Sequence, residues 1–284
     1  MSNRPVYAFY GHHKCATMWW NRIIANVCRK TGMNFRAVYD QDGFGGNLER
    51  FVDKHGVDFL SHGNADLSHI VGLPSHRGVH IIRDPRDIAV SAYFSHLHSH
   101  SVKEWSALEE YREKLRGMSK EEGLAAEIEN RRSEFKQIGT WDYDQPDMLE
   151  IKFEEMTTSN YELIIRVFEH YQLLDTSRYR TRHRIKELGF DVVDGISGSV
   201  GRKLTRRLRP ATVSGAELLG MAWRFRFQSL AGGRKEGDED VKSHFRKGAP
   251  GDWINHFTAD HKALFKRLYP DLVVKLGYEA ADDW

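Results

Sequence analysis

The chain has 284 residues, 40% of them hydrophobic, and a formal net charge of +2. This length and apolar content suit one α/β domain over residues 1–284 with a substantial core. The near-neutral charge argues against a nucleic-acid-binding protein, and the sequence has no apolar run as long as a membrane span. Two cysteines exclude a disulfide framework and favour a reducing compartment, so we expect a cytoplasmic protein.

Residues 6–32 predict a strand, a short loop and a helix. The apolar run 6–10 suits a buried strand, and apolar residues then recur at helical spacing from Met18 until Gly32. A loop between a strand and a helix directs backbone N–H groups and a helix N-terminus at one point, which favours an anion. Lys14 lies in this loop, where its ammonium can reach the same anion. The order Lys-Cys-Ala-Thr-Met-Trp at 14–19 is not the Walker A order, in which glycine stands directly before the lysine and serine or threonine directly after it.

The next segment, 35–50, is rich in glycine and aspartate and predicts a loop beside the strand ends. Residues 57–60 predict a second strand, which leads into His62. Open α/β sheets place their chemistry at the carboxyl ends of their strands. His62 is therefore a candidate functional residue.

Residues 79–82 predict a third strand, followed by Arg83 and a new helix. Asp84 suits the N-cap and Pro85 the first helical position, and Asp87 completes a pattern like a capping box. Arg83 and Ser91 lie eight residues apart, so a forked guanidinium and a hydroxyl can point at one anion.

The segment 101–138 is dense in charged residues and predicts surface helices. Three histidines precede it at alternate positions, which do not share one helix face, so we expect acceptor contacts rather than a metal site from His96, His98 and His100.

Residues 147–153 predict a fourth strand, followed by an amphipathic helix. The glycine-containing and basic segment 176–216 predicts a mobile loop or cap. Further on, Arg246, Lys247 and Gly248 place two cations on an approachable backbone, which predicts another phosphate clamp. The amphipathic tail 259–278 is expected to pack on the core.

Three of these segments resemble, in the same order, the motifs of sulfotransferases that use 3′-phosphoadenosine 5′-phosphosulfate (PAPS). The loop 14–19 is similar to the family's Lys-Ser-Gly-Thr-Thr-Trp, with other residues at Cys15, Ala16 and Met18. Arg-Asp-Pro-Arg-Asp-x-x-x-Ser-x-Tyr at 83–93 and Arg-Lys-Gly-x-x-Gly-Asp-Trp at 246–253 match more closely. The resemblance extends from residue 6 to residue 258 and implies a central parallel sheet flanked by helices, with a P-loop-like nucleotide-binding architecture.

The resemblance also implies how the cofactor binds. The 5′-phosphosulfate would be held by the first loop, and the 3′-phosphate of PAPS, or of its product adenosine 3′,5′-bisphosphate (PAP), by the other two segments. The adenine would be held by aromatic side chains, with Phe153 in place of the usual tyrosine. The residues concerned are Lys14, Cys15, Ala16, Thr17 and Met18 for the 5′ side, Arg83, Ser91, Arg246, Lys247 and Gly248 for the 3′ side, and Trp19, Phe153 and Phe227 for the adenine.

The resemblance implies in-line transfer of a sulfuryl group to a hydroxyl of a small-molecule acceptor, without a metal. Lys14 would stabilise the leaving phosphate and His62 would be the general base. His13 is a possible substitute for His62, whereas His69 and His76 are less well placed. The resemblance leaves a homodimer open. Two other functions stay open as well: an ATP-dependent phosphotransferase of the P-loop type, and a nucleotide-binding protein without turnover.

Overall fold

The computed structural model describes residues 6–73, 75–102, 107–175 and 209–284. Its centre is a five-stranded parallel sheet in the order β2-β3-β1-β4-β5. These strands are β1 Val6–Tyr10, β2 Phe35–Val38, β3 Phe59–His62, β4 His76–Ile82 and β5 Met148–Lys152. Two short strands, β6 Leu174–Asp175 and β7 Val213–Ser214, pair with each other. The predicted α/β class with a central parallel sheet is confirmed.

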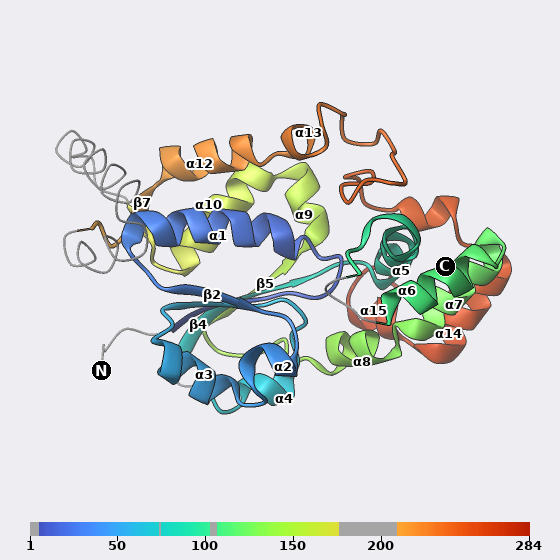
Figure 1. The fold of residues 1–284 in the computed structure, drawn as a ribbon, viewed down its shortest axis with the longest axis horizontal. Helices are drawn as coiled ribbons and strands as arrows, with labels where there is room; N and C mark the ends of the chain where they lie inside the picture. Colours follow the sequence, from blue (N-terminus) through green and yellow to red (C-terminus); the bar gives the residue numbers. More distant parts are fainter. Residues whose placement is uncertain (1–5, 74, 103–106, 176–208) are drawn as a thin grey trace.

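Helices cover both faces of the sheet (Figure 1). One face carries α1 Thr17–Thr31, α10 Asn160–His170 and α12 Gly215–Arg224, and the other carries α2 Gln41–Phe44, α3 Leu48–His55 and α4 Leu67–Ile70. Six further helices gather at one end of the molecule, together with the C-terminus: α5 Pro85–Phe94, α6 Leu108–Arg116, α7 Lys120–Asn130, α8 Arg132–Thr140, α14 Ala259–Leu268 and the short α15 Leu272–Lys275. Short turns of helix complete the chain: η1 Ser95–Ser99, α9 Phe153–Thr158, α13 Phe227–Leu230 and η3 Asp252–Asn255.

The two sides of the sheet have separate apolar cores because successive side chains of a strand point to opposite faces. Phe9 and Phe59 lie in the cluster that includes α1, whereas Ala8, Tyr10 and Leu60 lie in the cluster beneath α2 and α3. The predicted helix after the first loop has its apolar face buried, and Gly32 ends it in a left-handed conformation, as expected.

Two expectations for secondary structure and burial were wrong. The segment 35–50 is not a loop: it holds the edge strand β2 and two short helices whose N-caps are Asp40 and Asn47. The polar residues that suggested a loop are therefore helix caps. The helices within 101–138 are not confined to the surface, because Leu108, Leu124 and Phe135 are among their fully buried side chains.

The loop or cap expected over 176–216 lies mostly outside the described residues, which resume at 209 and include β7 and the start of α12. Among the helices that the structure describes, none is long and apolar enough to cross a bilayer. The single domain over 1–284 stays a prediction.

Candidate active site

The first loop is held in an unusual backbone conformation. Lys14 and Ala16 have φ values of 63° and 61°, in the left-handed region that residues with a Cβ rarely adopt. A side chain at Gly11 would put its Cβ 2.6 Å from the Thr17 Oγ1, so the loop requires glycine there. Left-handed residues of this kind occur where successive backbone N–H groups form an anion nest. The predicted order of strand, short loop and helix is present, and anion binding by the loop stays a prediction.

The loop lies at the switch point of the sheet, where the direction in which strands are added reverses. The chain leaves β1 toward β3 and β2 on one side, and continues through β4 and β5 on the other. In open α/β sheets the crevice at such a switch point is where ligands bind. Lys14 follows β1 and Arg83 follows β4, and the Arg83 Nη1 donates a 3.2 Å hydrogen bond to the Lys14 carbonyl oxygen.

Arg83 is almost fully buried, yet its charge is not fully paired. Its Nη2 lies 3.6 Å from an Asp87 oxygen, and its guanidinium carbon lies 4.3 Å from the centre of the Phe153 ring. The Nε atom is buried without a hydrogen-bond partner among the described residues. A buried, unsatisfied donor on a charged group is costly, so this arginine is suited to an anionic ligand.

Asp87 joins the second motif to the third. Its carboxylate accepts hydrogen bonds from the backbone N–H groups of Gly251 and Trp253, at 2.7 and 2.9 Å. The expected capping box at the start of α5 is therefore absent, and Asp84 alone caps the helix through the N–H of Arg86. A buried carboxylate with two backbone donors holds the C-terminal loop against α5.

The two cations of the third motif are fixed by acidic residues of the chain. Asp252 accepts from Arg246 at 2.6 Å and from Lys247 at 2.5 Å, and Arg246 also pairs with Glu239. The Arg246 guanidinium lies 4.6 Å from the ring centre of Phe94, which is one helical turn beyond Ser91 on α5. The third motif therefore lies beside the second.

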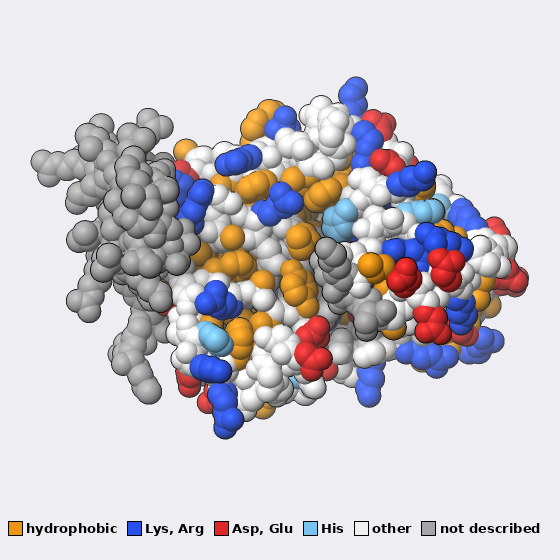
Figure 2. All heavy atoms as spheres, viewed as in Figure 1, with side chains coloured by type: hydrophobic (Ala, Val, Ile, Leu, Met, Phe, Trp, Pro, Cys, Tyr) orange, Lys and Arg blue, Asp and Glu red, His pale blue; other side chains and the backbone are white. Residues whose placement is uncertain are grey.

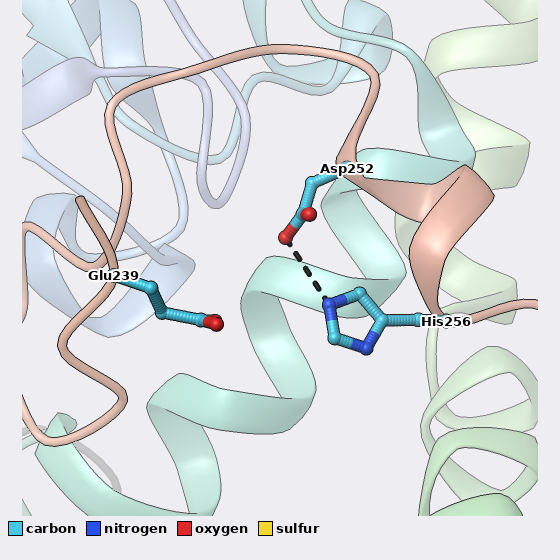
Figure 3. A group of neighbouring side chains, drawn as sticks. All are labelled: Glu239, Asp252 and His256. Carbon is cyan, nitrogen blue, oxygen red and sulfur yellow. Dashed lines mark hydrogen bonds and ion pairs between the residues drawn. The ribbon is translucent and has the colours of Figure 1, made fainter. Parts of the chain in front are cut away.

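Glu239, Asp252 and His256 form a group that resembles a metal site in composition (Figure 3). It is the one such group among the described residues, with ligand atoms within 4.8 Å of one another. Figure 3 shows the Asp252 carboxylate turned toward the ring of His256, to which it is hydrogen-bonded at 3.2 Å. Because Arg246 and Lys247 already neutralise the carboxylates, the group serves to orient these cations.

Lys14 is the electrostatic centre of the three motifs. Burial, together with the positive charges of Arg83 and Arg246, lowers the pKa of Lys14 to about 8. The three cations come from three distant segments and repel one another. Such an arrangement favours a ligand that brings negative charge into the same space.

Two of the aromatic residues predicted for the adenine lie against residues of the motifs, Phe153 against Arg83 and Phe227 against Gly248. Trp19 is largely buried and donates from its indole Nε1 to the Phe225 carbonyl oxygen at 2.9 Å. The Phe227 ring packs against Gly248, where an added Cβ would lie 2.4 Å from the ring. Gly248 is also left-handed, with φ of 69°, so this close approach requires glycine. We had expected Phe153 to end the fourth strand, but it is the first residue of α9.

The remaining residues predicted for the first loop differ in exposure. Cys15 is fully buried and burial raises its thiol pKa, so it contributes backbone rather than a reactive thiolate. Thr17 is buried, with its hydroxyl donating to the His12 carbonyl oxygen at 3.4 Å. Met18 is exposed beside Tyr39, whose hydroxyl points at the Met18 sulfur.

His62 lies at the end of β3, as predicted, but it is completely buried. Its Nε2 is 3.2 Å from the Nδ1 of His69, and the two rings are stacked. Burial, with a further contribution from His69, lowers the pKa of His62 to about 4. His62 is therefore a neutral imidazole at physiological pH.

Other histidines lie closer to the charge of Lys14. His13 stacks on His96 with ring centres 5.2 Å apart, and Arg131 contacts the Nδ1 of His13 at 3.2 Å. Burial lowers the pKa of His13, and so do the charges of Arg131 and Lys14. His96 is bonded to the buried Glu127 at 3.0 Å. On the face drawn in Figure 2, histidine side chains lie beside Lys and Arg side chains toward the end that holds α5–α7.

Sequence reasoning missed the acidic residues that organise the site. Asp87 and Asp252 were inside the recognised motifs, but only the fold shows that one fixes a backbone turn and the other two cations. It also missed His12 and His80, which are hydrogen-bonded to each other at 2.8 Å in the interior.

No family model matches the sequence, and no curated protein matches it either. Solved structures do match. A mouse sulfotransferase in complex with PAP has a TM-score of 0.54 and 15% identity, over 95% of this chain and 84% of that chain. A retinol dehydratase in complex with androsterone and PAP has a TM-score of 0.47 and 15% identity, over 96% and 82% of the two chains. The first of these likenesses shows that the chain has the fold of a sulfotransferase.

Proposed function

We propose that the protein is a PAPS-dependent sulfotransferase. One observation carries this proposal: Lys14, Arg83 and Arg246 come from the three motif segments and converge at the switch point of the sheet. A ligand with phosphate groups at both ends of an adenosine has the charge distribution that such a site requires.

The residues present fit this cofactor. The left-handed loop and Lys14 would hold the 5′ side, and Arg83, Ser91, Arg246 and Lys247 the 3′-phosphate. Trp19, Phe153 and Phe227 would contain the adenine. When bound, PAPS supplies an activated sulfuryl group. Lys14 would neutralise charge on the departing phosphate through its ammonium.

We propose His62 as the base that takes the proton of the acceptor hydroxyl. Its low pKa keeps the ring neutral, as a base requires. Because Nε2 faces His69, an acceptor hydroxyl can reach this nitrogen only if it takes the place of the His69 ring. Replacing His62 by Gln should lower turnover by roughly 10²-fold or more while PAP binding is kept. Equal loss of binding and turnover would make His62 a structural residue.

We further propose a small-molecule acceptor with a hydroxyl group and a cytoplasmic location. The location is supported by Cys15 and Cys28, which are both buried free thiols. A homodimer remains a prediction.

Calorimetric titration with PAP, with 5′-AMP, and with ATP without magnesium tests the proposal. We expect a strong preference for PAP, because only PAP presents the 3′-phosphate to Arg83 and Arg246. Equal affinity for all three ligands would contradict the PAPS assignment. ATP-dependent, magnesium-requiring phosphorylation of an acceptor would instead indicate a phosphotransferase, and tight PAPS binding without transfer to a broad acceptor panel would indicate a silent binding protein.

A further inference from the structure

Four histidines lie close to the Lys14 ammonium, and none of them belongs to the three motifs. They are His13, His96, His100 and His244. Burial lowers the pKa of each ring, and the positive charge of Lys14 lowers it further. The ring of His13 stacks on that of His96 and meets that of His100 edge-on, with ring centres 5.2 and 5.5 Å apart. His13 therefore connects Lys14 to the other two rings.

His96 and His100 belong to an unusual turn of the chain. Helix α5 continues into η1, a π-helix over Ser95–Ser99, and His100 is the residue that follows it. Single turns of π-helix are rare and occur frequently at functional sites. Arg112 of α6 fixes this turn, because it donates to the carbonyl oxygens of His96 and His100, each at 2.6 Å. The turn thus holds two imidazoles against His13.

The ring of His13 is oriented by Arg131. The Nη1 of Arg131 lies 3.2 Å from the Nδ1 of His13. A guanidinium has only donors and stays charged, so this Nδ1 accepts a hydrogen bond and carries no proton. The proton of the neutral ring therefore lies on Nε2. Within the described part of the chain, this Nε2–H has no hydrogen-bond partner, and the side chain is half-buried.

Arg131 is itself held in place by two carboxylates. It forms ion pairs with Glu127 of α7 at 2.9 Å and with Glu134 of α8 at 3.1 Å. Glu127 also accepts from the Tyr111 hydroxyl at 3.0 Å, and Glu134 accepts from the backbone N–H of His13. His13 is thus fixed at its backbone and at one ring nitrogen, which leaves the other ring nitrogen for a ligand.

The protonation of His13 suits a donor and not a base. Burial, with the charges of Arg131 and Lys14, lowers its pKa and prevents a second proton. The lone pair of Nδ1 faces Arg131, and Nε2 already carries a proton. The arrangement therefore disfavours His13 as the substitute for His62. A neutral imidazole with a fixed N–H is suited instead to a negatively charged oxygen.

We propose that His13 is a further catalytic residue, which donates from Nε2–H to an oxygen of the sulfuryl group during transfer, and that Arg131 is its positioning residue. This inference rests on the proposed function. In an in-line transfer the sulfuryl group lies between the leaving phosphate and the acceptor hydroxyl. His13 has the corresponding place: it adjoins Lys14, proposed for the leaving phosphate, and it contacts His96 and His100, expected at the acceptor.

The proton of His13 stays on its ring throughout. The sulfur–oxygen bond to the phosphate breaks with its electron pair on the phosphate, and a sulfur–oxygen bond to the acceptor forms. The proton of the acceptor hydroxyl goes to the general base. His13 forms no covalent bond, and its hydrogen bond stabilises negative charge on a sulfuryl oxygen.

Two substitutions at His13 distinguish a donor from a base. His13→Gln places an amide N–H near the position of Nε2 but has no nitrogen that can take a proton. His13→Asn keeps an oxygen for Arg131 but is too short to donate from the position of Nε2. The matched control is His55→Gln, which changes an exposed histidine at the end of α3.

Turnover is measured as transfer from radiolabelled PAPS to 2-naphthol, used as a probe acceptor. We expect His13→Asn to lower turnover roughly 10²-fold, as for the loss of one donor to developing charge. His13→Gln should stay within about 10-fold of the wild type because it restores an N–H. His55→Gln should have wild-type turnover. Equal losses in the two His13 variants, or wild-type turnover in His13→Asn, would overturn the proposal.

Calorimetric titration with PAP separates catalysis from nucleotide binding. PAP has no sulfuryl group, so its affinity should be unchanged in His13→Asn and His13→Gln. A fall in PAP affinity as large as the fall in turnover would make His13 part of the nucleotide site or of the loop structure, and would contradict the proposal.

Nuclear magnetic resonance of the ring nitrogens in the full-length, ¹⁵N-histidine-labelled protein tests the positioning by Arg131. The His13 signals are assigned by their loss in His13→Gln. In the wild type we expect the proton on Nε2 and a bare Nδ1 from about pH 6 to 9. In Arg131→Met, which removes the donor and its charge, the pKa of His13 should rise and its ring should become protonated on Nδ1 as the pH falls.

A wild-type proton on Nδ1, or signals of His13 that are the same in Arg131→Met, would overturn the positioning role. The wild-type measurement decides the tautomer even if Arg131→Met does not fold. It also needs no nucleotide. A failure of the proposed function would appear elsewhere, as a wild type that neither prefers PAP nor transfers a sulfuryl group, and the role of His13 would fall with it.

Discussion

Two groups of side chains lie at the same edge of the sheet: the cation site, formed by Lys14, Arg83 and Arg246, and the histidine row, formed by His12, His62, His80 and Glu150. The two groups handle charge in opposite ways. At the cation site, the positive side chains of Lys14, Arg83 and Arg246 lie close together. Carboxylates of the same chain neutralise their positive charge only in part. In the histidine row, burial lowers the pKa of His80 to about 3 and that of His62 to about 4. The row is therefore neutral where the cation site is positive.

This difference corresponds to two tasks. Fixed positive charge binds an anion and stabilises negative charge that develops on a leaving group. A neutral, hydrogen-bonded histidine is able to take up a proton. Changes at the cation site should therefore act on nucleotide affinity as well as turnover, whereas changes in the histidine row should act on turnover alone.

The largest effect is expected from Lys14→Ala. Loss of a donor to the developing charge should lower turnover by roughly 10²–10³-fold. Lys30→Ala is the matched control, because Lys30 lies at the other end of α1 and pairs with Glu217. The assay is transfer from radiolabelled PAPS, and near wild-type turnover would remove Lys14 from the mechanism.

Arg83→Met should act mainly on binding. Methionine keeps apolar packing against Phe153 but loses the charged donors. The loss of one charge-assisted hydrogen bond, about 1.5–3 kcal/mol, corresponds to roughly 10–100-fold in the dissociation constant of PAP. Affinity for 5′-AMP, which has no 3′-phosphate, should change less. If calorimetry finds the same loss for both nucleotides, Arg83 does not read the 3′ end.

The sequence allowed the cation site to be predicted more completely than the histidine row. Lys14, Arg83 and Arg246 stand in short motifs whose spacing is visible along the chain. The histidine row has no such signal, because His12, His80 and Glu150 come from three segments that only the strand register brings together. His62 was predicted from its position at a strand end. Its complete burial depends on Phe44 of α2 and His69 of α4, which contact its ring. The burial could not be predicted because we had expected a loop where α2 lies.

The pH dependence of PAP binding should distinguish the two regions further. Lys14 is charged below its pKa of about 8, and a bound anion favours the charged form. PAP affinity should thus be high below pH 8 and fall about tenfold as the pH rises from about 7 to 9. Lys14→Met should remove this part of the fall. Any part that remains belongs to groups such as Glu134, whose pKa burial raises to about 7.

The smallest effect is expected from Ala16→Gly, which tests the backbone of the first loop rather than its charges. Ala16 is the N-cap of α1 with φ of 61°, a conformation that costs a residue with a Cβ about 1–2 kcal/mol relative to the right-handed one. Glycine removes this cost but gives the unfolded chain about 0.5–1 kcal/mol more conformational freedom, so the free energy of unfolding should rise by roughly 0.5–1 kcal/mol. Ala25→Gly, inside the same helix, should instead lower it by about 1 kcal/mol. Urea unfolding measures both. If both variants lower the free energy of unfolding equally, the left-handed conformation of Ala16 is not strained. Lys14 would then be the one strained residue that supports the likeness of this loop to a glycine-containing anion nest.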